Sequence, residues 1–103
     1  AVSGGVAQAV VNVIKKEDPT REVKVVSAQG LAECKTMMQL AAAGKYNGYL
    51  LEGMACPGGC IAGAGTLADP ALSAMMLNKY KAQATMKTAA DTPYKDTLDK
   101  LKY

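Results

Sequence analysis

A short loop of proline and glycine that carries two thiols constrains this chain more than any other segment. Cys56 and Cys60 are four positions apart, and Pro57, Gly58 and Gly59 lie between them. Glycine lacks a Cβ and tolerates a positive φ, so a backbone rich in glycine can fold closely around a bulky inorganic group. Thiolates are the preferred ligands of soft metals and of iron–sulfur clusters. The segment therefore predicts a loop that cradles a metal cluster.

The spacing of the two cysteines excludes some kinds of thiol site but leaves several open. Two cysteines alone are compatible with a redox pair, a shared metal ion or half of a cluster site. The Cys-x-x-x-Cys spacing differs from the Cys-x-x-Cys of thioredoxin-like proteins and zinc ribbons. A radical-type Cys-x-x-x-Cys-x-x-Cys site would need a third cysteine where the chain has Gly63. The remaining cysteine, Cys34, falls on the apolar face of a predicted helix, which favours a buried structural thiol.

The glycines after the second cysteine superficially resemble a dinucleotide-binding fingerprint. Gly63, Gly65 and Ala68 have the spacing of such a motif. However, they do not directly follow a predicted strand, and no acidic residue ends a second strand about twenty residues later. We instead expect Gly63 and Gly65 to let the start of a helix approach the cluster, with backbone amides directed at its sulfurs.

The hydrophobic pattern predicts an α/β fold with a small parallel sheet flanked by helices. Residues 22–27 and 46–51 have the composition of strands, and residues 31–43 have helical periodicity. A strand, a helix and a strand joined by short loops form a βαβ unit, whose strands are parallel and whose crossover is right-handed. The cysteine loop would then leave the carboxyl end of a strand, where open α/β sheets usually bind ligands. We expect one domain over residues 1–103.

Helices are predicted on both sides of this unit. Residues 6–14 carry an apolar stripe at helical spacing, with Ser3 as the N-cap. The C-terminal part is predicted to be helical, because Asp69 is a good N-cap for a helix that runs to about Ala90. A short last helix, containing Leu98 and Leu101, is expected to start at Thr92-Pro93.

Composition excludes several classes of function. The chain has no His, which removes Ser-His-Asp triads, Cys-His nucleophiles and histidine-containing zinc sites. Its net charge of +3 comes from a mild Lys excess that lacks the aromatic interleaving of nucleic-acid binders. No apolar run approaches about 18 residues, so no membrane span is expected. We expect no nucleic-acid or membrane partner, no disulfide framework and a cytoplasmic location.

The cysteine loop belongs to a longer motif that resembles a known family. Residues 52–65 read Glu-x-Met-x-Cys-x-x-Gly-Cys-x-x-Gly-x-Gly, which resembles the third cluster-binding motif of the iron-iron (FeFe) hydrogenases. Residues 3–9 resemble the Gly-Gly-Val segment that precedes this motif, and residues 93–95 resemble a Pro-Tyr-Lys stretch that follows it. The chain departs from the family at Gln8, where Glu is usual, and at residues 63–67, where Gly-Gly-Gly-Gln-Pro is usual.

The resemblance implies specific roles for the residues of the motif. Cys56 would ligate a 4Fe-4S cubane, and Cys60 would bridge that cubane to a di-iron subcluster, the two parts together forming the H-cluster. Met54 would lie beside the di-iron part. Glu52 would either assist proton handling or form a structural hydrogen bond to the Gly-rich loop, and we favour the structural interpretation. The cofactor-binding glycines would be Gly59, Gly63 and Gly65.

The resemblance also implies that this chain is a part of a larger catalytic domain. The family has two further motifs, Thr-Ser-Cys-Cys-Pro and Met-Pro-Cys-x-x-Lys, each of which supplies a cubane ligand, and neither occurs here. We therefore expect a fragment that binds no cluster stably and is inactive alone. Its partners would be the remainder of the hydrogenase catalytic domain and ferredoxin or a similar electron carrier, and the parent would interconvert protons and electrons with dihydrogen.

Two alternatives remain open from the sequence. Half-sites of Cys56 and Cys60 could share a cluster across a homodimer, which would make the chain a non-catalytic iron–sulfur binding or sensing module. A scaffold lobe without a cluster, whose cysteine pair is vestigial or reversibly oxidised, is the third possibility.

Overall fold

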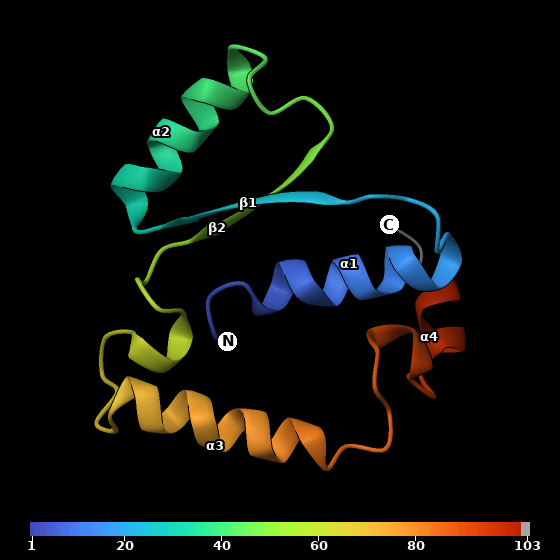
Figure 1. The fold of residues 1–103 in the computed structure, drawn as a ribbon. Coiled ribbons are helices and arrows are strands. Elements are labelled where there is room, and N and C mark those ends of the chain that lie inside the picture. The colour runs from blue at the N-terminus through green and yellow to red at the C-terminus, as the bar shows by residue number, and fades with distance from the viewer. Residues whose placement is uncertain (102–103) are drawn as a thin grey trace.

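The computed structural model describes residues 1–101, which form a small parallel sheet surrounded by helices (Figure 1). This arrangement confirms the predicted α/β class. In chain order the elements are the helix α1 (Gly5–Glu17), the strand β1 (Lys24–Gln29), the helix α2 (Leu31–Ala42), the strand β2 (Tyr49–Met54), the 3₁₀ helix η1 (Cys60–Ala62), the helix α3 (Pro70–Ala82), the 3₁₀ helix η2 (Ala89–Asp91) and the helix α4 (Lys95–Asp99).

The elements β1, α2 and β2 form the predicted βαβ unit. The two strands pair in parallel, from Lys24 opposite Tyr49 to Gln29 opposite Met54. Parallel neighbours cannot be joined by a tight hairpin, and α2 supplies the necessary crossover. In Figure 1, α2 lies on one side of the strands and α1 on the other. The cysteine loop therefore follows the carboxyl end of β2, as expected for an α/β ligand site.

Both strands lie further along the chain than the hydrophobic pattern predicted. The strand β1 begins two residues, and β2 three residues, after the expected starts. The amide of Tyr49 donates to the carbonyl of Tyr46 at 3.0 Å, and Gly48 has a φ of 78°, so the chain turns just before β2. In the parallel register, residues 21–23 lie opposite this turn and have no strand to pair with. As a result β2 extends into the cysteine motif and ends at Met54.

The first and last helices also begin at residues other than those expected. The N-cap of α1 is Gly4, in the left-handed conformation, and not Ser3. The helix α4 begins at Lys95 and not at Thr92. It contains Leu98 but ends before Leu101. Thr92 is the C-cap of η2 and has an extended backbone, as proline favours in the residue before it, so α4 does not begin there.

The helix α3 starts as predicted and ends early. The carboxylate of Asp69 accepts a backbone amide of its first turn at 2.9 Å. The helix stops at Ala82 instead of continuing to about residue 90. A capping box formed by Thr88 and Asp91 then starts η2, and Lys16 of α1 pairs with Asp91. The hydrogen bond from Lys16 lowers the pKa of the Asp91 carboxyl. These contacts turn the chain back toward α1 and interrupt the helix.

The hydrophobic core is small and is divided between the two faces of the sheet, one covered by α1 and the other by α2. Its buried apolar residues are Ala7, Val11, Ala28 and Met37. The radius of gyration is 16.0 Å, whereas a compact domain of this length is expected to have about 13 Å. Among residues 1–101, no helix has both the length and the apolar character needed to cross a membrane. Large apolar side chains are exposed along α3, namely Leu72, Met75, Met76, Leu77 and Tyr80.

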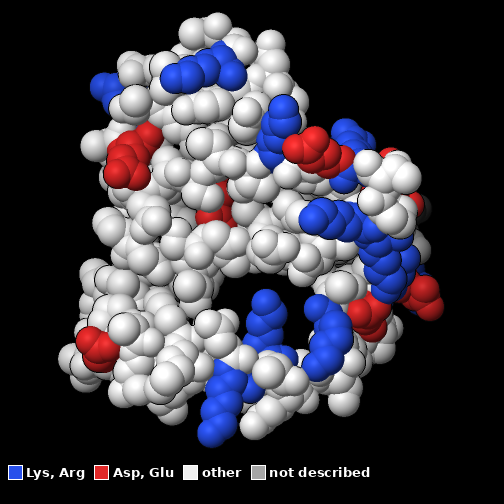
Figure 2. Space-filling view, in the orientation of Figure 1, with Lys and Arg blue, Asp and Glu red and all other residues white. Residues whose placement is uncertain are grey.

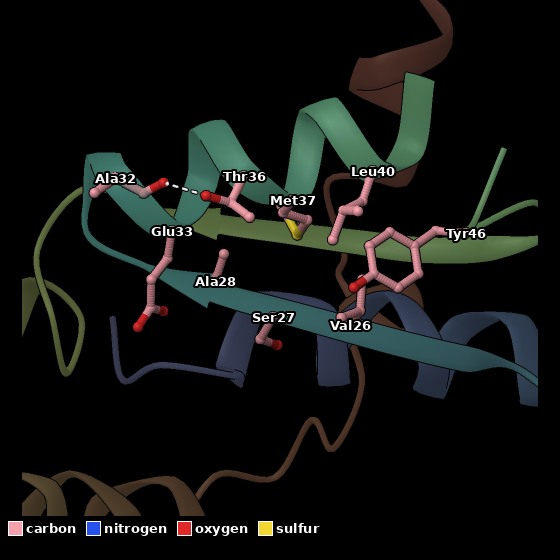
Figure 3. Close-up of a pocket in the computed structure, with 9 residues that line it drawn as sticks. All are labelled: Val26, Ser27, Ala28, Ala32, Glu33, Thr36, Met37, Leu40 and Tyr46. Carbon is pink, nitrogen blue, oxygen red and sulfur yellow. Dashed lines mark hydrogen bonds between the residues drawn. The ribbon is translucent and has the colours of Figure 1, made fainter. Parts of the chain in front are cut away.

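Two hollows show how loosely the elements pack. One, of about 330 Å³, lies between α2 and β1, and in Figure 3 Met37 and Leu40 reach into it from α2, beside Tyr46. The other, of about 410 Å³, is lined by residues of α1, α3 and η2, and its only charged side chains are Lys81 and Lys87. Figure 2 shows basic side chains bordering an opening through the molecule in this view. The helix α3 is thus separated from much of the core.

Two neighbouring methionines of α2 test the position of the core. Met37 is 6% exposed and Met38 is 60% exposed. We predict that Met37→Ala lowers the free energy of unfolding by about 2–3 kcal/mol, because it removes buried apolar atoms and enlarges the hollow beneath α2. Met38→Ala, the matched control, should change it by less than about 0.5 kcal/mol. Urea unfolding followed by far-UV circular dichroism would measure both, and equal effects would contradict this core.

Candidate functional site

The end of β2 delivers the motif to the edge of the sheet. Glu52, Gly53 and Met54 are the last residues of β2, and Met54 pairs with Gln29 at the end of β1. The carbonyl of Met54 accepts the amide of Gly30 at 2.8 Å, which extends the ladder by one bond. The cysteine loop begins two residues later. Its starting point is therefore fixed by backbone hydrogen bonds of the sheet.

The loop itself is a tight turn that needs two glycines. Gly58 and Gly59 have φ values of 86° and 91°, a region that side chains with a Cβ rarely adopt. The amide of Gly59 donates to the carbonyl of Cys56 at 3.0 Å and closes the turn. The amide of Gly58 donates to the side-chain oxygen of Gln29 at 2.7 Å. The 3₁₀ helix η1 then begins at Cys60, so the two cysteines flank the turn.

Both thiols of the loop are free, and a glycine leaves space beside one of them. Cys56 is partly buried, and Cys60 is exposed. A Cβ at Gly63 would lie 3.2 Å from the Sγ of Cys56, which is closer than ordinary packing allows. A pair of accessible soft donors with a side-chain-free backbone beside them suits an iron–sulfur group. Among the side chains that the structure describes, no group of three or more His, Cys, Asp or Glu could hold a metal ion.

The other glycine after the loop does not behave as expected. Gly65 has a φ of 85°, and no atom lies within 4 Å of the position of a Cβ there. No helix starts at Gly63 or Gly65, because the chain between η1 and α3 is irregular and α3 begins only at Pro70. The expectation that a helix starts at these glycines is therefore wrong, and their role in binding the cluster stays a prediction. The sequence Gly63-Ala64-Gly65 has no side chain that could cap a helix, whereas Asp69 has one.

The third cysteine supports the strand instead of joining the loop. The thiol of Cys34, on α2, lies 3.7 Å from the carbonyl oxygen of Met54 and 3.8 Å from that of Ala28. A Cβ at Gly53 would lie 3.3 Å from this sulfur, so β2 passes close to α2 only because residue 53 is glycine. Cys34 is partly buried, as expected for a structural thiol, though not fully. Met54 is likewise partly buried, at the end of β2.

Glu52 is the only buried charged residue among the described residues, with 6% of its surface exposed. Its two carboxylate oxygens accept backbone amides of Gly4 and Ala7, at 2.8 and 2.9 Å. Burial alone would raise the pKa of this carboxyl, but the hydrogen bonds from Ala7, Gly4 and Ser27 outweigh burial and hold the pKa below its usual value. The structural interpretation of Glu52 predicted a bond to the Gly-rich cysteine loop. The bonds go instead to the start of α1, which has no acidic residue of its own in its first turn.

The residues before α1 contact the cysteine loop, and sequence reasoning missed this contact. The amide of Ser3 donates to the carbonyl of Gly58 at 3.1 Å, and the amide of Ile61 donates to the carbonyl of Ala1 at 3.3 Å. A Cβ at Gly59 would overlap Ala1 and would lie 2.8 Å from the amide nitrogen of Ser3. Backbone pairing of two irregular segments leaves no hydrophobic pattern in the sequence. The run of small residues at both segments was the one available signal.

Comparison with known families identifies this arrangement. A family model described as the iron only hydrogenase large subunit, C-terminal domain, matches residues 1–64, from the segment before α1 through the cysteine loop. The chain belongs to this family. The predicted resemblance to the FeFe hydrogenases is thus confirmed, and the parent protein falls among the oxidoreductases. The helices α3 and α4 lie outside the matched residues. No curated protein and no solved structure matches the chain.

Two glycines, one in the cysteine loop and one after it, test how closely the loop meets the residues before α1. Gly59 and Gly65 both have positive φ, but only at Gly59 would a Cβ collide with backbone. We predict that Gly59→Ala costs about 3 kcal/mol of stability, from backbone strain and overlap together. Gly65→Ala, the control, should cost about 1 kcal/mol from strain alone. Urea unfolding would separate them, and equal costs would contradict the close approach.

The buried carboxylate predicts a loss of stability in acid. The pKa of Glu52 is lowered from its ordinary value of 4.5 in the folded protein. Its contribution is therefore fully present above pH 4.5 and is lost as the pH falls through the lower folded-state value. In Glu52→Gln, unfolding free energy should fall less steeply below pH 4.5 than in the wild type.

Glu22→Gln, at an exposed carboxylate before β1, is the control for removing a charge. Urea titrations at several pH values between 3 and 7 would measure the slopes, at roughly equal ionic strength. A wild-type slope in Glu52→Gln would show that this carboxylate does not stabilise the fold.

Proposed function

We propose that this chain is the part of an iron-iron hydrogenase catalytic domain that supplies Cys56 and Cys60 to the H-cluster. One observation carries the proposal: the family match covers the whole cysteine loop, both thiols of that loop are free, and Gly63 leaves space beside the thiol of Cys56. Cys56 would ligate the 4Fe-4S cubane, and Cys60 would bridge it to the di-iron subcluster. The parent would exchange electrons with ferredoxin or a similar carrier.

The H-cluster, when bound, supplies the chemistry that interconverts protons and electrons with dihydrogen. The residues of this chain position and enclose it. The sheet fixes the start of the loop through Met54, and Gly58 and Gly59 give the loop its sharp turn. The side chain of Met54 would contribute apolar surface beside the di-iron part. Both oxygens of Glu52 accept backbone amides, which supports its structural role over proton handling.

The remainder of the catalytic domain is the proposed partner of this chain. A cubane needs four thiolates, and the loop offers two. The exposed apolar residues of α3 and the open space between α1 and α3 are consistent with a chain that packs against further protein. Residues 1–103 would thus form one lobe of the catalytic domain. We propose that the chain is inactive by itself and that it works in the cytoplasm.

Complementation would test this function. The chain would be produced with the remainder of an iron-iron hydrogenase catalytic domain in an anaerobic host that matures the H-cluster, and hydrogen evolution from reduced viologen would be measured. We predict activity from the combination and none from the chain alone. Cys56→Ser and Cys60→Ser should each lower activity by more than about 100-fold, since even partners outside the ligand set cost up to that much. Cys34→Ser is the matched control and should retain activity.

Three outcomes would contradict parts of the proposal. Activity from the chain alone would contradict its dependence on the rest of the domain. Activity in Cys56→Ser or Cys60→Ser would contradict the ligand assignment. If the chain alone, reconstituted with iron and sulfide, bound a cluster as a dimer that both serine variants abolished, it would be a self-sufficient, non-catalytic iron–sulfur module.

A further inference from the structure

The buried carboxylate and the cysteine loop meet on the same short stretch of backbone. The amide of Gly4 donates to Glu52, and the amide of the preceding residue, Ser3, donates to the carbonyl of Gly58. Two consecutive amides therefore bind different elements: that of Gly4 binds a side chain of β2, and that of Ser3 binds the cysteine loop. Only the Cα and the carbonyl carbon of Ser3 separate these two amide nitrogens, so holding one contact restricts where the other can lie.

The segment before α1 contacts the loop on both sides of Cys60. Ile61, directly after Cys60, donates its amide to Ala1, so residues 1–3 both accept from and donate to the loop. Any Cβ at Gly59 would collide with this segment. Glycine-rich turns have many accessible conformations when free. The segment before α1 reduces that freedom at the point where the two thiols are presented.

We propose that Glu52 is a positioning residue for the two cysteines: its carboxylate fixes the start of α1, and residues 1–3 transmit that position to the loop through the bonds to Gly58 and Ile61. The proposal rests on the function proposed above, because it assumes that the geometry of this loop matters for ligation. The carboxylate is buried and accepts an amide at each oxygen, so it fixes this joint in both position and direction. Gln29 holds the opposite side of the turn through the amide of Gly58.

The test uses the metal-free, 103-residue chain under anaerobic conditions. Glu52→Gln keeps the size of the side chain but replaces one acceptor oxygen with an amide group that faces a backbone N–H. We expect the amides of Ser3 and Ile61 to exchange with solvent about tenfold faster, as when one buried hydrogen bond is lost. Alkylation of Cys56 by iodoacetamide, read by mass spectrometry, should accelerate relative to Cys34 in the same molecule. Glu22→Gln should leave both readouts at wild-type values.

A second variant breaks the same connection at another point. Ser3→Pro removes the amide that reaches Gly58 but leaves the acceptor at Glu52 unchanged. It should accelerate exchange at Ile61 and alkylation at Cys56, while the amide of Ala7 in α1 stays protected. In the double variant the two effects should not add, because each breaks one step of a single connection.

The outcomes separate positioning from simple stabilisation. If Glu52→Gln weakens α1 but leaves Ile61 exchange and the ratio of Cys56 to Cys34 alkylation unchanged, Glu52 only stabilises the fold and the proposal is wrong. If Glu52→Gln does not fold, Ser3→Pro decides: wild-type behaviour of Ile61 and Cys56 in that variant overturns the connection. These readouts need no metal. A failure of the proposed ligand assignment would appear instead as Cys56→Ser retaining hydrogen evolution in the complementation experiment.

Discussion

The carboxylate of Glu52 is the interaction on which the arrangement of this molecule depends. Burying a charge is costly unless hydrogen bonds compensate it, and here two amides at the start of α1 do so. These amides have no partner within the helix, and the positive end of the helix dipole favours an anion at this place. A single residue of β2 thus satisfies the first turn of a helix 45 positions earlier in the chain. Glu52 thus joins α1 to the sheet, where the small hydrophobic core offers few other contacts.

The same joint determines where the cysteines lie. Their loop is attached to the sheet by β2, to Gln29 at the end of β1, and to the segment before α1. Of these attachments, the two outside β2 come from parts of the chain more than 25 residues away in sequence. The motif supplies the ligands and a flexible backbone. The contacts with β1 and with the segment before α1 determine the conformation of the loop. The motif at residues 52–65 therefore does not contain all of the residues that hold the loop in place.

The sequence allowed the βαβ unit and the place of the loop to be predicted, because hydrophobic periodicity and glycine carry strong local information. The start of β2 was predicted too early, since Tyr46 has strand propensity but the turn at Gly48 removes its partner. The end of α3 was missed because the ion pair that brings Asp91 to α1 joins it to Lys16, 75 positions away in the chain. The partner of Glu52 could not be found either, because nothing local specifies which buried amides a carboxylate accepts. A local turn decided the first of these differences, and long-range polar contacts decided the other two.

The glycines make the loop flexible, and contacts with other parts of the fold restrict that flexibility. A cluster ligand must be held within narrow limits, yet a turn through Gly58 and Gly59 is intrinsically adaptable. Replacing these glycines would stiffen the loop, but at Gly59 no side chain fits against Ala1 and Ser3. Instead, backbone hydrogen bonds from the segment before α1 hold the turn. The buried carboxylate of Glu52 in turn holds that segment. Constraint on the thiols therefore comes from residues that never touch them, and substitutions at Glu52, Ser3 and Gln29 should alter the site without altering its ligands.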